Sequence, residues 1–270
     1  MKITDLTVIT SKDNSRLRRA RAVRDGREPG TLFVEGVRLA HELVRSALRP
    51  LAIFVLEELS EKHASLVADL ARDSETEIHR VSPKIYDSIT DTENTQGIVV
   101  LAEKPKRQNL KAAAAENSLF VYLNKINNPS NLGAVVRTAE AAGHICVITS
   151  PGSTDVYSPK ALRASMGSVF RVPIFTDVPL AEAVEIARNN NVRVVAADVG
   201  ANQSYVEADW RGARMLVLGS EAHGLDAKEL SLMDEVVLIP MENGVESLNL
   251  AVSAGILLFD AKRQRAEARA

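Results

Sequence analysis

The sequence is poor in cysteine: Cys146 is the single thiol among 270 residues. One thiol cannot form an internal disulfide, so a small disulfide-stapled scaffold is excluded. Cys146 lies in the apolar run 145–148, which favours a buried, inert thiol over a catalytic nucleophile. This cysteine usage is typical of proteins in the reducing cytoplasm, where we expect the chain to reside.

Long hydrophobic runs are also missing. The longest apolar stretches, such as 250–259, are about half a membrane span, and Ser253 interrupts this one. Residues Met1 to Asp5 lack the basic and long apolar regions of a signal peptide, and no lipidation motif is visible. We therefore expect the protein to have no membrane partner.

Motifs of several common enzyme classes are absent. None of the 14 glycines forms Gly-x-Gly, so the dinucleotide-binding fingerprint is missing. Gly219 and Gly224 have the spacing of a Walker A loop, but Leu225 follows them. The sequence contains no His-Glu-x-x-His, Cys-x-x-Cys or Gly-x-Ser-x-Gly, and its five histidines are scattered. Common nicotinamide enzymes and hydrolases therefore lose support, and no metal site is expected.

The charge is nearly balanced overall but unevenly distributed. The formal net charge is −2, with 46% hydrophobic and 25% charged residues, an ordinary globular composition. Residues 1–27 nevertheless hold three aspartates against eight basic residues: Lys2, Lys12, Arg16, Arg18, Arg19, Arg21, Arg24 and Arg27. Such an element can bind a phosphate backbone, and we expect RNA contacts from Lys12, Arg16, Arg18 and Arg19. The alternative, a solvated helix face with ordinary arginine usage, has equal weight on charge alone.

The first part of the chain alternates between strand and helix patterns. Residues 13–25 have helical spacing, with Asn14 or Ser15 as the cap. Helical patterns at 37–48 and 59–71 separate short apolar runs at 31–34, 51–56, 78–81 and 98–101. The sequence therefore predicts an α/β domain over residues 1–105 and a linker at 106–117 that runs into a short helix.

Residues 118–270 are predicted to form a second domain around a mainly parallel sheet with helices on both faces. Six apolar runs have strand length: 119–123, 145–149, 169–175, 192–197, 215–218 and 236–239. Helical or turn-rich segments separate most of them, which is typical of parallel sheets.

Three polar segments follow predicted strands in this second domain. The segment 124–143 opens a helix that carries Arg137 one to two turns from its start. In the segment 216–225 two glycines bracket Glu221, which could accept a hydrogen bond from a ligand. In the segment 239–255 Ser247 is predicted to cap a helix of small residues, with Asn249 in its first turn. Parallel strands gather such loops at one sheet edge, where α/β proteins bind ligands. Taken singly, each segment could also be an ordinary capped helix or tight turn.

Together the three segments closely resemble the signature motifs of the SpoU (TrmH-like) branch of the SPOUT RNA methyltransferases, over residues 119–260. The N-terminal part looks like the RNA-binding domain of that family, which is of the ribosomal-protein L30e type. The resemblance there rests on Asn14-Ser15-Arg16 and on the segments 32–38 and 90–98. Thr95 stands where the family usually has proline before Gln-Gly, a mild departure.

The resemblance implies methyl transfer from S-adenosylmethionine to a ribose 2′-OH of rRNA, with 23S rRNA preferred, or of tRNA. It also implies a deep trefoil knot in the C-terminal domain and a homodimer formed through that domain. Carried over position by position, the catalytic set is Asn131, Arg137, Glu221, Ser247 and Asn249. The cofactor set is Leu218, Gly219, Ser220, Ile239, Met241 and Leu248.

Two questions stay open at this level. Arg137 is either a phosphate clamp that stabilises developing negative charge, which we favour, or a deprotonated base; a charged guanidinium has no acceptor. The whole chain could instead be a non-catalytic RNA-binding protein with a vestigial methyltransferase domain. An α/β oxidoreductase or ligand-binding module has less support, because the dinucleotide-binding fingerprint is absent.

Overall fold

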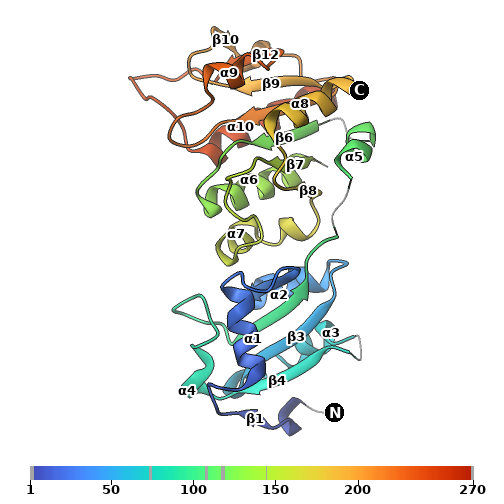
Figure 1. Ribbon diagram of the computed structural model, residues 1–270, viewed down its shortest axis with the longest axis vertical. Coiled ribbons are helices and arrows are strands. Elements are labelled where there is room, and N and C mark those ends of the chain that lie inside the picture. Colours follow the sequence, from blue (N-terminus) through green and yellow to red (C-terminus); the bar gives the residue numbers. More distant parts are fainter. Residues whose placement is uncertain (1–2, 73–74, 107–108, 117–118, 144, 269–270) are drawn as a thin grey trace. The chain divides into compact units, whose positions relative to one another are not determined.

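Alternating helices and strands build two units in the computed structural model, which describes residues 3–72, 75–106, 109–116, 119–143 and 145–268. One unit comprises the chain up to Lys106 together with the segment Tyr157–Arg171. The other comprises Arg107–Val156 and Val172–Ala270. Figure 1 labels most of the helices and strands of both units.

The first unit contains a five-stranded sheet in the order β1-β4-β3-β5-β2. Strand β5 runs antiparallel to β2 and β3, and the other pairs are parallel. Its strands are β1 (Val8–Ile9), β2 (Thr31–Glu35), β3 (Pro50–Leu56), β4 (Glu77–Val81) and β5 (Ile98–Glu103). Its α-helices are α1 (Ser15–Arg24), α2 (Val37–Val44), α3 (Ala64–Leu70), α4 (Pro83–Tyr86) and α7 (Pro159–Ser165). Its 3-10 helices are η1 (Ile3–Asp5), η2 (Glu57–Leu59) and η3 (Ser168–Phe170).

Helix α1 shows how the sequence pattern places charge on this unit. Asn14 caps the helix by accepting a hydrogen bond from the Arg16 N–H at 2.9 Å. Leu17, Ala20 and Val23 follow at helical spacing and are buried against the sheet. Arg16, Arg18 and Arg19 are exposed, whereas Arg21 is half-buried and donates to Ser88 Oγ at 3.3 Å.

The second unit contains a seven-stranded sheet in the order β10-β12-β9-β11-β6-β7-β8, and every described pairing in it is parallel. Its strands are β6 (Leu119–Leu123), β7 (Cys146–Thr149), β8 (Ile174–Phe175), β9 (Arg193–Ala197), β10 (Gln203–Ser204), β11 (Arg214–Leu218) and β12 (Glu235–Leu238). Its helices are α5 (Leu110–Glu116), α6 (Pro129–Ala142), α8 (Leu180–Asn189), η4 (Tyr205–Glu207), α9 (Ala227–Leu230) and α10 (Leu250–Glu267).

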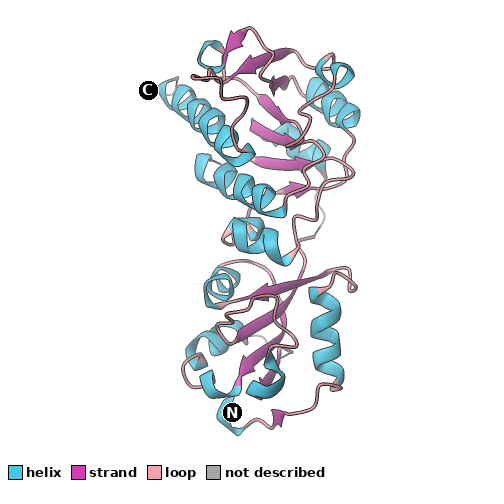
Figure 2. Ribbon diagram, turned by 90° about the vertical axis from the view of Figure 1, so that its left-hand side faces the viewer, coloured by secondary structure: helices cyan, strands magenta, loops and turns pink. Residues whose placement is uncertain are grey.

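Helices flank this parallel sheet, as Figure 2 shows. Alternate residues of the central strands, such as Tyr122, Val194 and Val217, pack in one core with Leu180 and Val184 of α8. Helices α6 and α10 lie side by side. The predicted α/β fold with a mainly parallel sheet is confirmed. Within the described residues, no helix is both long and apolar enough to cross a membrane.

Two predictions about local structure are wrong. The run 169–175 was expected to form one strand, but it begins with the end of η3, and β8 pairs with β7 only over Ile174–Phe175. Pro173 lacks the N–H that a longer ladder would need, and Gly167 at φ 88° turns the chain. Ser247 does not cap the last helix, which begins at Leu250 with Asn249 as its cap.

Candidate active site

The carboxyl ends of four parallel strands, β6, β9, β11 and β12, meet at one edge of the second sheet. The segments that follow β9, β11 and β12, together with Asn131 of α6, enclose a cavity of about 600 Å³. That volume is within the usual range for small-molecule sites, about 300–1,000 Å³. Every residue of the expected cofactor set lines this cavity: Leu218, Gly219, Ser220, Ile239, Met241 and Leu248. The expected catalytic residues Asn131, Glu221, Ser247 and Asn249 line it as well.

A chain of hydrogen bonds joins the three polar segments. Glu221 Oε1 accepts from the Asn131 amide nitrogen at 3.1 Å, and the Asn131 amide oxygen accepts from Asn249 Nδ2 at 3.0 Å. The Asn249 oxygen in turn accepts from the Ala251 N–H at 2.9 Å and so caps α10. One side chain from each segment is therefore locked to the next, with amide orientations that the network defines.

Glu221 is held as a carboxylate by protein donors. Its two oxygens also accept from the backbone N–H groups of Asn127 at 3.2 Å and Asn128 at 3.3 Å. Burial acts to raise the pKa of Glu221, but the bonds from Asn131 and from backbone N–H groups outweigh burial and leave the pKa below its usual value. Glu221 therefore braces the loop that opens α6.

The turn after β11 depends on glycine at its two ends. The Ser220 N–H donates to the Gly224 carbonyl at 3.1 Å, and the Gly224 N–H donates to the Ser220 carbonyl at 3.0 Å. A Cβ atom at Gly219 would lie 2.3 Å from the Gly224 carbonyl carbon, and Gly224 has φ 62°. Only glycine tolerates such close backbone approach, so the tight turn leaves room for the cavity.

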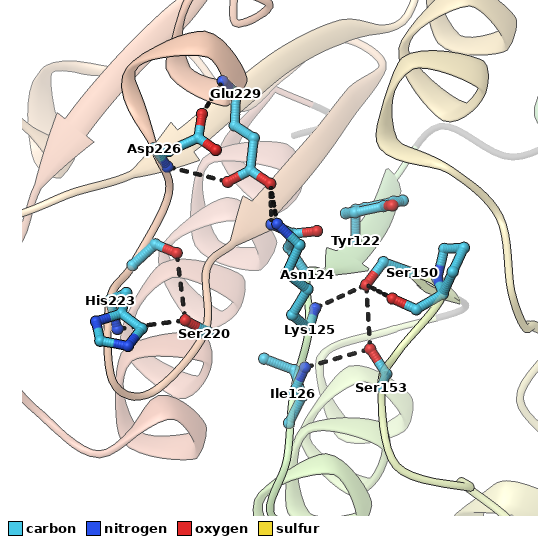
Figure 3. A network of polar contacts seen from close by, with 12 residues as sticks. Tyr122, Asn124, Lys125, Ile126, Ser150, Ser153, Ser220, His223, Asp226 and Glu229 are labelled. Atoms are coloured by element: carbon cyan, nitrogen blue, oxygen red, sulfur yellow. Dashed lines mark hydrogen bonds and ion pairs between the residues drawn. The ribbon is translucent and has the colours of Figure 1, made fainter.

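Behind the loop that opens α6, Glu229 of α9 binds three donors (Figure 3). Glu229 Oε1 accepts from Asn124 Nδ2 at 2.9 Å and Lys125 Nζ at 2.8 Å, and Oε2 accepts from the Asp226 N–H at 2.9 Å. Burial acts to raise the pKa of Glu229, but Lys125, Asp226 N–H and Asn124 lower it below the usual value. Glu229 and Glu221 thus hold the same loop from two sides.

Lys125 adopts a backbone conformation that is rare for its residue type, with φ 54°. The Lys125 N–H donates to the buried Ser150 hydroxyl at 2.7 Å, and the Ile126 N–H donates to Ser153 Oγ at 3.2 Å (Figure 3). Together with the ion pair to Glu229, these contacts offset the strain at Lys125. They hold the loop that leads to Asn131.

Arg137 lies apart from the other expected catalytic residues. It is exposed on α6 and is not among the residues that line the cavity. Within the part of the chain that the structure describes, its guanidinium makes no hydrogen bond or ion pair. The described residues thus place Arg137 on the same helix as Asn131 but leave it accessible to a charged partner.

Sequence reasoning missed the segment after β9. Ala197, Asp198 and Val199 also line the cavity, as do His223 and Glu246. The strand order explains the first three, since β9 lies between β11 and β12 and its carboxyl end reaches the same edge. A parallel-strand argument applied to all strands could have found them. Among the described residues, no cluster of His, Cys, Asp or Glu could hold a metal ion.

The four expected RNA-binding residues of the first unit are all exposed on or beside α1. Arg16 pairs with Glu77 at 3.0 Å, and Arg19 pairs with Glu28 at 2.8 Å. The side chains of Lys12 and Arg18 have no partner among the residues that the structure describes. Exposed ion pairs are worth about 0–1 kcal/mol, so Arg16 and Arg19 can exchange their partners for phosphate.

Two family models match consecutive parts of the chain. The model of the SpoU rRNA methylase family matches residues 118–259. A second model, described as RNA 2′-O ribose methyltransferase substrate binding, matches residues 33–108.

Individual relatives cover most of the chain. The 23S rRNA (guanosine-2′-O-)-methyltransferase RlmB of Xylella fastidiosa is 33% identical, over 78% of this chain and 88% of its own length. The 23S rRNA (guanosine(2553)-2′-O)-methyltransferase RlmP of Bacillus subtilis is 29% identical, over 85% of this chain and 87% of its own length. The AdoMet-bound rRNA methyltransferase from Sinorhizobium meliloti has a TM-score of 0.81 at 27% identity, over 95% of this chain and 97% of that one.

Proposed function

Because the chain belongs to the SpoU rRNA methylase family, we propose that it transfers a methyl group from S-adenosylmethionine to a ribose 2′-OH of rRNA. The observation that carries this function is the Glu221–Asn131–Asn249 chain, which joins the three polar segments beside a cavity of cofactor size. A protein that only bound RNA would not need this arrangement.

The residues around the cavity fit S-adenosylmethionine. When bound, this cofactor supplies a methyl group already activated by a sulfonium. The turn between Gly219 and Gly224 and the segment 239–241, which line the cavity, would hold this cofactor. Lining carboxylates suit the positive charges of the cofactor. What the protein must add is orientation of the attacking hydroxyl and stabilisation of the charge that develops on it.

We assign Arg137 to the RNA rather than to the cofactor. Its exposed guanidinium, free of partners among the described residues, suits a bidentate contact with the target phosphate and the developing alkoxide. A guanidinium loses its proton only at a pKa above ~12, so a role as base is the less favoured alternative. In this proposal Asn131, Glu221, Ser247 and Asn249 orient the ribose and the helix that carries Arg137.

For the substrate we propose 23S rRNA, because relatives named for that activity cover most of the chain; tRNA is the alternative. The first unit, which contains most of the substrate-binding match, supplies phosphate contacts through Lys12, Arg16, Arg18 and Arg19. The ribose 2′-OH distinguishes RNA from DNA at the target. The L30e-type assignment of this unit and the trefoil knot of the second stay predictions.

We propose that the chain acts in the cytoplasm as a homodimer formed through its C-terminal unit. Exposed apolar residues gather along α10 and just before it: Val245 is 52%, Val252 50% and Phe259 47% exposed. Such residues are costly in water unless a partner covers them. Sedimentation should give a dimer at micromolar concentration; an active monomer would contradict this part of the proposal.

The enzymatic proposal is tested by methyl transfer. Purified protein, radiolabelled S-adenosylmethionine and unmodified 23S rRNA should give labelled RNA, and mapping should place the methyl group on one ribose. The same RNA with a 2′-deoxy residue at that position should remain unlabelled. Tight RNA binding without transfer, together with no cofactor binding in calorimetry, would favour the non-catalytic alternative.

A further inference from the structure

The cavity carries negative charge, and two of its carboxylates, those of Asp198 and Glu246, have no individual role assigned above. Three carboxylates line it, those of Asp198, Glu221 and Glu246, whereas none of its described lining residues is lysine or arginine. In a partly enclosed site a carboxylate interacts with a cation more strongly than in bulk water. The cavity therefore favours a positively charged ligand over a neutral one.

The three carboxylates differ in what they already bind. Glu221 is occupied by the side chain of Asn131 and by two backbone N–H groups. Glu246 lies in an exposed loop before α10. Asp198 is partly buried at the end of β9 and makes no ion pair with any residue that the structure describes. Asp198 is thus the carboxylate best placed to meet a ligand cation.

The position of Asp198 is fixed on both sides. Its Oδ1 accepts from the Gly200 N–H at 2.8 Å, which holds the carboxylate group in one orientation. Its Oδ2 lies against the turn after β11, 3.6 Å from where a Cβ of Gly224 would be. Strand β9 lies between β11 and β12, so Asp198 stands between the cavity-lining segments that follow those two strands.

We propose that Asp198 is a specificity-determining residue that selects the sulfonium cofactor over its demethylated, neutral thioether product. This inference rests on the proposed function, because it takes S-adenosylmethionine as the ligand. The two compounds differ by one methyl group and one positive charge. The carboxylate attracts the first compound more strongly, and that attraction ends when the methyl group leaves, so fresh cofactor displaces the product.

The test compares Asp198→Asn, which keeps the shape and removes the charge, with the unaltered protein in calorimetry. The ligands are S-adenosylmethionine, S-adenosylhomocysteine and sinefungin, which carries an amino group in place of the sulfonium. Affinity for S-adenosylmethionine and sinefungin should fall about tenfold, a loss expected for one charge pair near a surface. Affinity for S-adenosylhomocysteine should change less than about twofold by the same charge argument.

Asp177→Asn is the matched control, since Asp177 is exposed, belongs to the same unit and is not among the cavity residues. Its affinities should equal those of the unaltered protein. An equal loss for all three ligands at Asp198→Asn would mean that the carboxylate binds a group they share, such as the ribose hydroxyls, and would overturn the proposal. Unchanged affinities would overturn it as well.

Salt dependence tests the same idea without any substitution. The preference of the unaltered protein for S-adenosylmethionine over S-adenosylhomocysteine should shrink as ionic strength rises from roughly 0.05 to 0.5 M, because salt screens the charge pair. A preference that does not change with salt would contradict a role for charge. If the unaltered protein binds none of the three compounds, the proposed function itself fails, a result distinct from failure of Asp198.

Discussion

The cavity of the second unit and the outer face of α1 in the first differ in charge and in how their polar groups are held. Around the cavity, Glu221, Asn131 and Asn249 form one connected chain with defined donors and acceptors. On α1, Arg16 and Arg19 are held by exposed ion pairs, and Lys12 and Arg18 are without partners among the described residues.

The difference matches two kinds of binding. A small ligand that must be placed for one reaction needs polar groups in a single fixed geometry. A phosphate backbone needs exposed cations, which displace the counterions bound to the RNA and can do so in many arrangements. The formal net charge of −2 conceals both regions, because the carboxylates of one unit offset the arginines of the other.

The largest effect on methyl transfer should come from Arg137, an exposed residue of α6 that does not line the cavity. Arg137→Ala should reduce the single-turnover rate of methyl transfer by about 10²-fold or more, as expected for loss of a charged stabiliser. Affinity for S-adenosylmethionine in calorimetry should be unchanged, because Arg137 does not line the cavity. A large loss of cofactor affinity would show that Arg137 contributes to the cavity and would contradict its assignment to the RNA.

Arg137→Lys distinguishes the two roles considered for this residue. Lysine keeps the charge but lacks the bidentate fork, so a clamp stays impaired at every pH. Lysine loses its proton more readily than arginine, so a base would regain activity as pH rises from 6 to 10. Recovery to the unaltered rate at high pH would contradict the clamp.

The arginines of α1 should have the next largest effect, which should be limited to RNA binding. Changing Arg16, Arg18 and Arg19 together to Ala should weaken RNA binding about tenfold or more at low salt and flatten its salt dependence. Cofactor affinity should stay the same. Because Arg18 has no partner among the described residues, Arg18→Ala alone should cost more than Arg19→Ala, whose side chain must first leave Glu28. Filter binding over a salt series measures the RNA affinity and its salt dependence. If the triple variant binds RNA as tightly as the unaltered protein, the basic face of α1 is only a solvated helix surface.

Much of the fold could be predicted because apolar runs are local. The strands β6, β9, β11 and β12 each fall within two residues of their expected bounds. The two-residue strands β1 and β10 escaped notice, since two residues carry no periodic pattern. The run 169–175 is not one strand, because apolar composition does not reveal the 3-10 turn at its start.

The site could be predicted only in part, for a related reason. Each polar segment was identified on its own residues, but the bonds from Asn131 to Glu221 and Asn249 span 90 and 118 positions along the chain. Nor could composition decide between Ser247 and Asn249 as the helix cap, since both residue types cap well. In the structure Asn249 caps the helix with its amide oxygen, while its amide nitrogen donates to Asn131.

Asn249 offers a way to separate capping from site function. Asn249→Asp keeps the oxygen that accepts from the Ala251 N–H but cannot donate to Asn131. We expect a stability change of less than about 1 kcal/mol and a fall in transfer rate of roughly tenfold. Asn249→Ala should lose both the helix cap and the hydrogen bond to Asn131, with a further stability loss of about 1 kcal/mol. Full activity of the Asp variant would mean that the amide chain is structural only.

The smallest effect on methyl transfer should come from Glu229, which acts through stability because it holds the same loop from behind. In Glu229→Gln an amide group must face Asn124 and Lys125 or the Asp226 N–H, so we expect a loss of about 1–2 kcal/mol in unfolding free energy. The pKa of Glu229 is lowered by folding, so its carboxylate stabilises the protein above the ordinary value of 4.5, and this contribution disappears as pH falls through the lowered value. The stability difference between the two proteins should therefore be full at pH 7 and shrink below about pH 4.

Denaturant unfolding at several pH values measures this stability difference. The control is Glu185→Gln, which alters an exposed carboxylate on α8. A difference that stays constant with pH would mean that packing, rather than the charge of Glu229, holds the loop.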